Sequence, residues 1–135
     1  ADSAGVEVFY VTNRSDALKG ATIGNLKKHG FPYADSAHVY TKSSTSNKTA
    51  RRKIIQKNHH ILLYLGDNLG DFAAGFAKSP ESRSQDFFKA HHAKIGDRFI
   101  VFPNPMYGDW TDPVYEGQPD SLSDYQKRIR ALKAY

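Results

Sequence analysis

The sequence predicts an α/β fold with a mostly parallel β-sheet. Three apolar runs, residues 6–11 (VEVFYV), 60–65 (HILLYL) and 98–102 (RFIVF), have the continuous hydrophobicity of strands covered on both faces. Polar stretches of helical length lie between them, and strands that alternate with helices favour parallel pairing through right-handed crossovers. The 135 residues have the size of one domain. We therefore predict a single domain over residues 1–135.

The first half of the chain continues this pattern after the first strand. A helix is predicted at residues 17–29, because Ser15 or Asp16 can cap its start and Gly30 can end it. The other elements expected here are a short strand at residues 38–41, a polar Ser/Thr loop at 42–48 and a helix at 49–58.

The second half begins with the strand at residues 60–65, which ends at Gly66 and Asp67. Residues 104–119 contain three of the six prolines and form a predicted long loop, and loops of this length are usually functional or disordered. The other expected elements are a helix start at residues 71–76, a polar break at 79–83, a helix at 84–91 and a final helix at 122–135 capped by Ser121 or Ser123.

Composition excludes several classes of protein. Apolar residues make up 39% and charged residues 24%, which is typical of a globular chain. There is no cysteine, so disulfides and cysteine-ligated metals are excluded. No apolar run approaches the roughly 20 residues that span a bilayer, and the first residues, ADSAGVEVFYV, do not resemble a signal peptide. The net charge of +5 gathers at residues 48–57 and 127–133, which we interpret as solvated helix faces.

Polar side chains follow the predicted strands at the edge where ligands of parallel sheets collect. Thr12, Asn13 and Arg14 follow the first strand, and Asp67 and Asp71 follow the strand at residues 60–65. Lys48 ends the polar loop between them. Carboxylates suit Mg²⁺, and a lysine and a hydroxyl can neutralise and orient phosphoryl oxygens. By spacing alone, the two aspartates could equally be a turn residue and a helix N-cap, and Lys48 a surface lysine.

The order of these residues resembles motifs two, three and four of the haloacid-dehalogenase superfamily. The residues of these motifs resemble still more closely those of the class C acid phosphatases, which include bacterial outer-membrane lipoprotein 5'-nucleotidases. The matching stretches run from about Val6 to Trp110 and read VFYVTNR, TIGNLKKHGF, KSSTSNKTARR, ILLYLGDNLGDF and FIVFPNPMYGDW. The resemblance implies a Rossmann-like three-layer sandwich and Mg²⁺-dependent hydrolysis of a phosphomonoester, of the acid phosphatase or 5'-nucleotidase type.

The resemblance also implies a role for each matching residue. Thr12, helped by Asn13, would bind the phosphoryl oxygens, and Lys48 would hold the phosphoryl group and the attacking carboxylate. Asp67 would be a direct Mg²⁺ ligand, and Asp71 would orient Lys48 or a metal-bound water. Tyr107 would stack on the base of a nucleoside monophosphate, although Tyr107 and Trp110 could equally pack onto the core. The six histidines match no motif position and are interpreted as surface or structural residues.

The chain lacks the family's first motif, Asp-x-Asp-x-Thr, which carries the nucleophile and the general acid and base. No Asp-x-Asp pair occurs in the sequence, and the helical cap is absent as well. Without the family's first, central strand the sheet would have a gap of about 10 Å between the strands at residues 6–11 and 60–65. We therefore expect the C-terminal portion of a longer protein, inactive alone, or a swapped homo-oligomer in which another strand fills the gap.

The expected partner is a small-molecule phosphate ester. The resemblance implies a bacterial cell-envelope location, in the periplasm or as an outer-membrane lipoprotein, with membrane contact only through a lipid anchor in a missing N-terminal part. One alternative is a non-catalytic phosphate- or nucleotide-binding domain. Another, a nucleic-acid-binding module, is disfavoured because it needs Arg51, Arg52, Lys53 and Lys57 to form one continuous basic patch.

Overall fold

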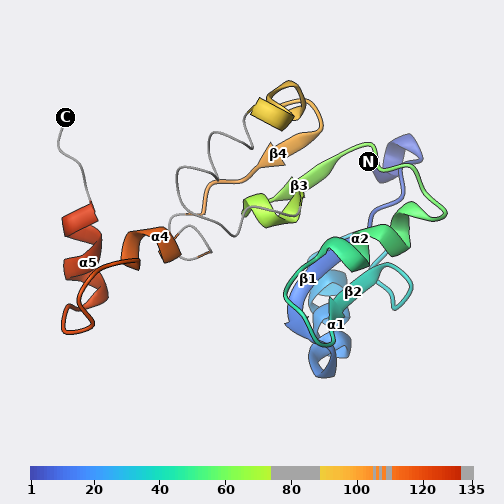
Figure 1. The fold of residues 1–135 in the computed structure, drawn as a ribbon. Helices are drawn as coiled ribbons and strands as arrows, with labels where there is room; N and C mark the ends of the chain where they lie inside the picture. Colours follow the sequence, from blue (N-terminus) through green and yellow to red (C-terminus); the bar gives the residue numbers. More distant parts are fainter. Residues whose placement is uncertain (74–88, 105, 107, 109–110, 132–135) are drawn as a thin grey trace. The chain divides into compact units, whose positions relative to one another are not determined.

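The computed structural model describes residues 1–73, 89–104, 106, 108 and 111–131. The chain consists of two compact units, Ala1–His60 and Ile61–Tyr135, and each is described by itself (Figure 1). The prediction of one domain stays a prediction. None of the helices in the described ranges combines the length and the hydrophobicity that a membrane crossing requires.

The first unit is built around two parallel strands joined by a helix. Strand β1 (Tyr10–Ser15) pairs with β2 (Val39–Lys42), and Tyr10 lies opposite Val39. The connection contains a 3-10 turn, η2 (Asp16–Leu18), and helix α1 (Lys19–Lys28), which packs against both strands. The Ser15 hydroxyl accepts a hydrogen bond from the Ala17 N–H at 3.3 Å, so Ser15 caps this connection. The predicted parallel strand–helix–strand unit is thus confirmed.

The boundaries of the first strand differ from the prediction of residues 6–11. Strand β1 begins at Tyr10 and continues to Ser15. Strand β1 begins at Tyr10 because its partner, β2, begins at Val39, which lies opposite Tyr10. Residues 6–9 have no partner strand among the described residues. Thr12 and Asn13 consequently lie inside the strand, and the adjoining helix begins at Lys19 instead of residue 17.

Helix α2 (Thr49–Gln56) follows β2 and the polar loop, and a short 3-10 turn, η1 (Asp2–Ala4), opens the chain. Helix α2 buries Ile55 together with two arginines, Arg51 and Arg52. Positions 51 and 55 are four residues apart and therefore share one helix face. The buried apolar residues of this unit are Ala34, Val39 and Ile55.

The second unit contains a second parallel pair, β3 (Tyr64–Gly66) and β4 (Phe99–Val101), with Tyr64 opposite Phe99. Short 3-10 turns follow β3 and precede β4, η3 (Leu69–Asp71) and η4 (His92–Lys94). The core centres on the rings of Phe72 and Phe99, which stack with centroids 5.2 Å apart. The two strands are shorter than the predicted residues 60–65 and 98–102, because only three residues on each find a partner.

The expectation that the strand at residues 60–65 is covered on both faces is wrong for the described structure. Leu62, Leu63 and Leu65 are 52%, 46% and 58% exposed. On β4 and just after it, Val101 and Phe102 are also exposed. The surface of the apolar segment at residues 60–65 is therefore only partly buried.

The C-terminal segment is more helical than predicted. Helix α4 (Asp112–Tyr115) lies within residues 104–119, which were expected to be loop, and Pro113 in its first turn has the backbone angle that a helix start requires. Helix α5 (Asp124–Ala131) is capped by Ser123, whose hydroxyl accepts from the Gln126 N–H at 3.3 Å while its own N–H donates to Gln126 Oε1 at 2.9 Å. Most of the predicted helix at residues 84–91, and residues 74–76 of the helix start at 71–76, lie outside the described residues.

Candidate functional site

Thr12 and Asn13 are the two middle residues of β1. The Thr12 hydroxyl oxygen accepts from the Arg14 N–H at 3.2 Å, and the Asn13 side-chain oxygen accepts from Arg51 Nη2 at 2.7 Å. Neither the Thr12 hydroxyl hydrogen nor the Asn13 amide group donates to another described residue. Both groups can therefore donate to a bound phosphoryl oxygen.

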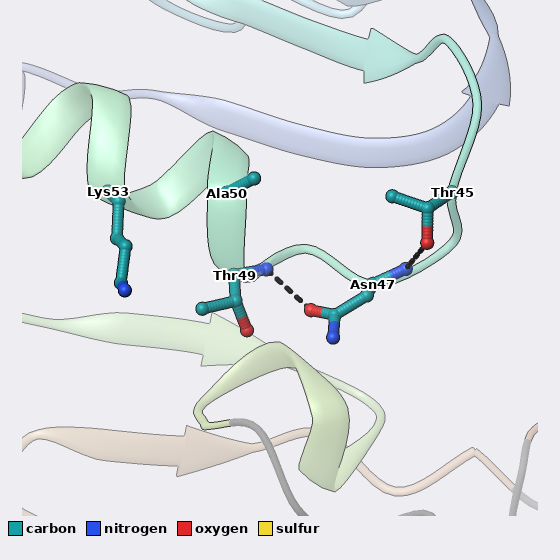
Figure 2. A pocket seen from close by; sticks show the side chains of 5 residues that line it. All are labelled: Thr45, Asn47, Thr49, Ala50 and Lys53. Atoms are coloured by element: carbon teal, nitrogen blue, oxygen red, sulfur yellow. Dashed lines mark hydrogen bonds between the residues drawn. The ribbon is translucent and has the colours of Figure 1, made fainter.

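Lys48 is the N-cap residue of α2 and is half-buried. Its carbonyl oxygen accepts from the Arg52 N–H at 3.0 Å, which is the first bond of the helix. The loop before it is shaped by two local hydrogen bonds (Figure 2), from Asn47 N–H to Thr45 Oγ1 at 3.2 Å and from Thr49 N–H to Asn47 Oδ1 at 2.8 Å. Such side-chain turns fix the backbone that carries the lysine.

A shallow pocket of about 350 Å³ lies beside this loop (Figure 2). It is lined by hydroxyl and amide side chains, one methyl group and one ammonium group, from Thr45, Asn47, Thr49, Ala50 and Lys53. Although these residues carry hydroxyl, amide and ammonium groups, most of the surface that they present to the pocket is apolar.

Arg51 connects Thr12 and Asn13 to the loop before Lys48, and it was not predicted as a site residue. Its Nη1 donates to the Thr12 carbonyl oxygen, and its Nη2 donates to Asn13 Oδ1 at 2.7 Å. Nη2 also lies 3.3 Å from the carbonyl oxygens of Thr45 and Ser46. The signal that could have revealed it is the spacing from Ile55, because a cation four residues from a buried apolar residue shares its helix face.

Asp67 follows β3 directly and is exposed. Its Oδ2 accepts from Asn104 Nδ2 at 2.6 Å, and Asn104 Oδ1 in turn accepts from the Met106 N–H at 3.1 Å. Asn104 was also missed by the sequence analysis. It follows β4 closely, and the carboxyl ends of two paired parallel strands meet at one edge, so its position along the chain was the available signal.

Asp71 closes a capping box on the turn that follows Asp67. Its Oδ2 accepts from the Asn68 N–H at 3.2 Å, and Asn68 Oδ1 accepts from the Gly70 N–H at 2.9 Å. A Cβ atom placed on Gly66 would lie 2.5 Å from Asp71 Oδ2 and 2.6 Å from Asp71 Cβ. Glycine is therefore required at position 66 for Asp71 to lie against the end of β3.

The acidic groups of the second unit suit a hard, oxygen-preferring cation. Mg²⁺ is usually held by one or two carboxylates and keeps several waters. Asp67 fits this pattern, because one of its oxygens is oriented by Asn104 and its Oδ1 has no partner among the described residues. Among those residues no three His, Asp or Glu side chains gather closely enough to hold an ion by themselves. Among the described residues, Asp67 together with water molecules can supply the ligands of such an ion.

The structure brings the predicted residues together within each unit. Thr12, Asn13 and the loop before Lys48 meet through Arg51 in the first unit. Asp67 and Asp71 flank one turn in the second. The predicted substrate residue Tyr107, like Trp110, lies outside the described residues. The continuous basic patch considered for nucleic acid does not form, because Arg51 and Arg52 are only 9% and 7% exposed.

A separate polar cluster in the first unit surrounds His38. Its Nδ1 lies 2.7 Å from Asp35 Oδ1, and its Nε2 lies 2.6 Å from Glu7 Oε1. Glu7 Oε2 also contacts His59 Nε2 at 3.1 Å. The hydrogen bond with Asp35 raises the pKa of His38 most, with a smaller contribution from Glu7, and the same bond lowers the pKa of Asp35. His38 is thus a structural residue, as interpreted from the sequence.

Comparison with known proteins identifies the family. Residues 1–110 match the family described as HAD superfamily, subfamily IIIB (acid phosphatase). The chain belongs to this family. It is also similar to the solved structure of the class C acid phosphatase from Bacillus anthracis, with 38% identity and a TM-score of 0.84, over 99% of this chain and 57% of that one. The same protein with tungstate bound matches with 38% identity and a TM-score of 0.85, over the same shares of the two chains.

These matches confirm the resemblance to the class C acid phosphatases and the α/β fold of the haloacid-dehalogenase type. The two parallel strand pairs and their helices form part of such a fold. The chain spans little more than half the length of the solved structures it matches, 57%.

Proposed function

We propose that the full-length protein hydrolyses phosphomonoesters with the help of Mg²⁺, as an acid phosphatase or 5'-nucleotidase. In this proposal the present chain supplies the phosphate- and metal-binding residues. The observation that carries the proposal is the joining of Thr12, Asn13 and the loop before Lys48 by Arg51, in a chain that belongs to an acid phosphatase family.

The first unit binds and neutralises the phosphoryl group. The Thr12 hydroxyl and the Asn13 amide donate to its oxygens, since neither donor is used by another described residue. The Lys48 ammonium offsets the negative charge of the phosphoryl oxygens and of the attacking carboxylate. No Asp-x-Asp pair occurs in these 135 residues, so the proposal takes the nucleophile from a part of the protein beyond them.

The second unit holds the metal. Asp67 binds the ion through the carboxylate that Asn104 orients, and Asp71 keeps the turn after β3 in shape through its bond to the Asn68 N–H. When bound, Mg²⁺ would neutralise charge on the phosphoryl oxygens. Asn104 acts through Asp67, and such outer partners fix the direction of a ligating oxygen.

The substrate is a small phosphate ester, and a nucleoside monophosphate is the proposed choice within that class. Tyr107 would supply a flat surface for the base. We further propose a bacterial cell-envelope location. Both proposals rest on the resemblance to the 5'-nucleotidase lipoproteins.

The proposal is tested by steady-state hydrolysis of p-nitrophenyl phosphate by the full-length protein in Mg²⁺. Asp67→Asn and Lys48→Met each lower kcat/KM by at least about 100-fold, because each removes charge stabilisation from the transition state. The matched controls are Asp97→Asn and Lys57→Met, which change exposed residues of the same types in the same units. Full activity in both Asp67→Asn and Lys48→Met would contradict the proposed function of these residues. Phosphate binding without hydrolysis by the wild type would favour the non-catalytic alternative instead.

A further inference from the structure

Arg51 is a buried cation whose hydrogen bonds cross the first unit. It is 9% exposed and projects from α2, the helix that Lys48 begins. One arm of its guanidinium group binds the Thr12 carbonyl oxygen, and the other binds Asn13 Oδ1 and approaches the Thr45 and Ser46 carbonyl oxygens. These partners lie 38 or 39 residues away on β1 and five or six residues away on the loop.

The partners of Arg51 are all uncharged oxygens. No carboxylate pairs with Arg51 among the described residues. Burial, and then the charge of Arg52, lower the pKa of Arg51, yet a guanidinium remains protonated at physiological pH. Burying a charge is costly unless it is hydrogen-bonded, and the four oxygen acceptors offset part of that cost. The positive charge is thus retained next to the residues proposed to bind a dianion.

We propose that Arg51 is a positioning residue for phosphate binding, which fixes the Thr12–Asn13 segment of β1 against the loop that leads into Lys48. This inference rests on the proposed function, because it assigns the two segments to one substrate group. Arg51 binds the Thr12 carbonyl oxygen and Asn13 Oδ1, and so leaves the Thr12 hydroxyl and the Asn13 amide donors for a ligand. The guanidinium fork is essential to this role, since a lysine ammonium cannot bind two separated segments in a fixed plane.

Arg52 offers an internal control. It lies on the same helix, is 7% exposed, and donates to Thr49 Oγ1 of its own helix at 3.1 Å. Arg51→Met and Arg52→Met both remove a buried cation from the same helix, and the bonds to Thr12 and Asn13 described above belong to Arg51. Comparing the two separates a loss of positioning from a general loss of stability.

The experiment measures kcat and KM for p-nitrophenyl phosphate, and Ki for inorganic phosphate, in the full-length protein with Mg²⁺. Arg51→Lys is expected to lower kcat/KM and weaken phosphate inhibition by about 10-fold, and Arg51→Met by about 100-fold, because small displacements of a binding group have effects of this size. Arg52→Lys and Arg52→Met stay within about 3-fold at a temperature where circular dichroism shows every variant folded. If Arg51→Met does not fold, Arg51→Lys carries the test.

A double-mutant cycle adds a readout that a purely structural role would not change. If Arg51 acts through Asn13, the Asn13→Ala, Arg51→Lys double variant is no slower than the slower single variant. Folded Arg51 variants with the kinetics of the Arg52 variants, or strictly additive losses in the cycle, would overturn the inference. An inactive wild type would contradict the proposed function separately, and calorimetric titration with inorganic phosphate then decides the role of Arg51. Equal phosphate affinity in wild type and Arg51→Lys would overturn it.

Discussion

The predicted site residues of the two units are held in place in different ways. In the first unit, a buried arginine joins Thr12 and Asn13 to a loop more than 30 residues away. In the second unit, Asp71 accepts a bond from Asn68, three residues before it, and Asp67 accepts a bond from Asn104, 37 residues after it. The first group therefore depends on the packing of α2, whereas the aspartates depend on the geometry of the turn after β3 and on its bond to Asn104.

The strands of the two units also differ in how much of their surface is buried. Strand β2 buries Val39 completely, and buries Thr41, whose hydroxyl donates to Asp16 Oδ1 at 2.5 Å. Beside β4, strand β3 leaves Leu65 58% exposed. The first unit thus has covered strand faces of its own, and the second presents an apolar strand surface. The prediction of a central strand from outside this chain stays a prediction.

The largest effect on stability is expected at Gly66, where the turn at residues 67–71 leaves no room for a side chain. Gly66→Ala places a Cβ atom 2.5 Å from Asp71 Oδ2, so the capping box must open. We expect a loss of about 1–3 kcal/mol in the free energy of unfolding from overpacking, and at least about a 10-fold loss of kcat/KM.

Gly24→Ala on α1 is the matched control, because a Cβ atom there meets nothing within 4 Å. Alanine favours the helix by about 0.5–1 kcal/mol. A Gly66→Ala variant as stable and as active as Gly24→Ala would contradict the proposed geometry. Chemical unfolding and kinetics of the same preparations provide both readouts.

An intermediate effect is expected from Asn104→Ala, which removes the donor to Asp67 Oδ2. The Mg²⁺ concentration for half-maximal activity should rise by about 10-fold or more, because outer partners of metal ligands contribute on this scale. The maximal rate at saturating Mg²⁺ should change less. Asn58→Ala, an exposed asparagine, is the control. If Asn104→Ala reaches half-maximal activity at the same Mg²⁺ concentration as the wild type, Asn104 has no role in metal binding.

A smaller effect is expected from pH on the first unit. His38 has a raised pKa, so its stabilising contribution is complete below its ordinary value of 6.5 and is lost as the pH rises through the raised value. Asp35 has a lowered pKa, so its contribution is complete above its ordinary value of 3.8 and is lost as the pH falls through the lowered value. The two contributions therefore coincide between pH 3.8 and pH 6.5.

This pH dependence can be measured by NMR titration of the histidine rings. The His38 midpoint should lie above the ordinary histidine value of 6.5. His38→Gln should reduce the loss of unfolding temperature between pH 5.5 and pH 8.5. A His38 midpoint at or below 6.5 would contradict the described bonds to Asp35 and Glu7.

The sequence predicted the family and the parallel α/β pattern, and it narrowed each of two caps to a pair of residues, because these features depend on local residues or on motif order. Ser123, one of the pair Ser121 and Ser123, caps α5, whereas Ser15, one of the pair Ser15 and Asp16, caps the 3-10 turn before α1. It did not predict where strands begin, since three of residues 6–9 are apolar, yet the segment lacks a partner strand among the described residues. Arg51 was interpreted as a solvated cation, because composition cannot distinguish an exposed arginine from one satisfied by distant carbonyl oxygens. Asn104 was missed for the same reason, as its role depends on the pairing of β3 with β4.

A crystal structure of the full-length protein with Mg²⁺ and tungstate tests the central claim most directly, because tungsten is located by its anomalous scattering. The account predicts tungstate within hydrogen-bonding distance of Thr12 Oγ1 and Lys48 Nζ, with Mg²⁺ bound to an oxygen of Asp67 and Arg51 still bridging β1 to the loop. Tungstate bound away from Thr12 and Lys48, or Mg²⁺ bound without Asp67, would contradict it.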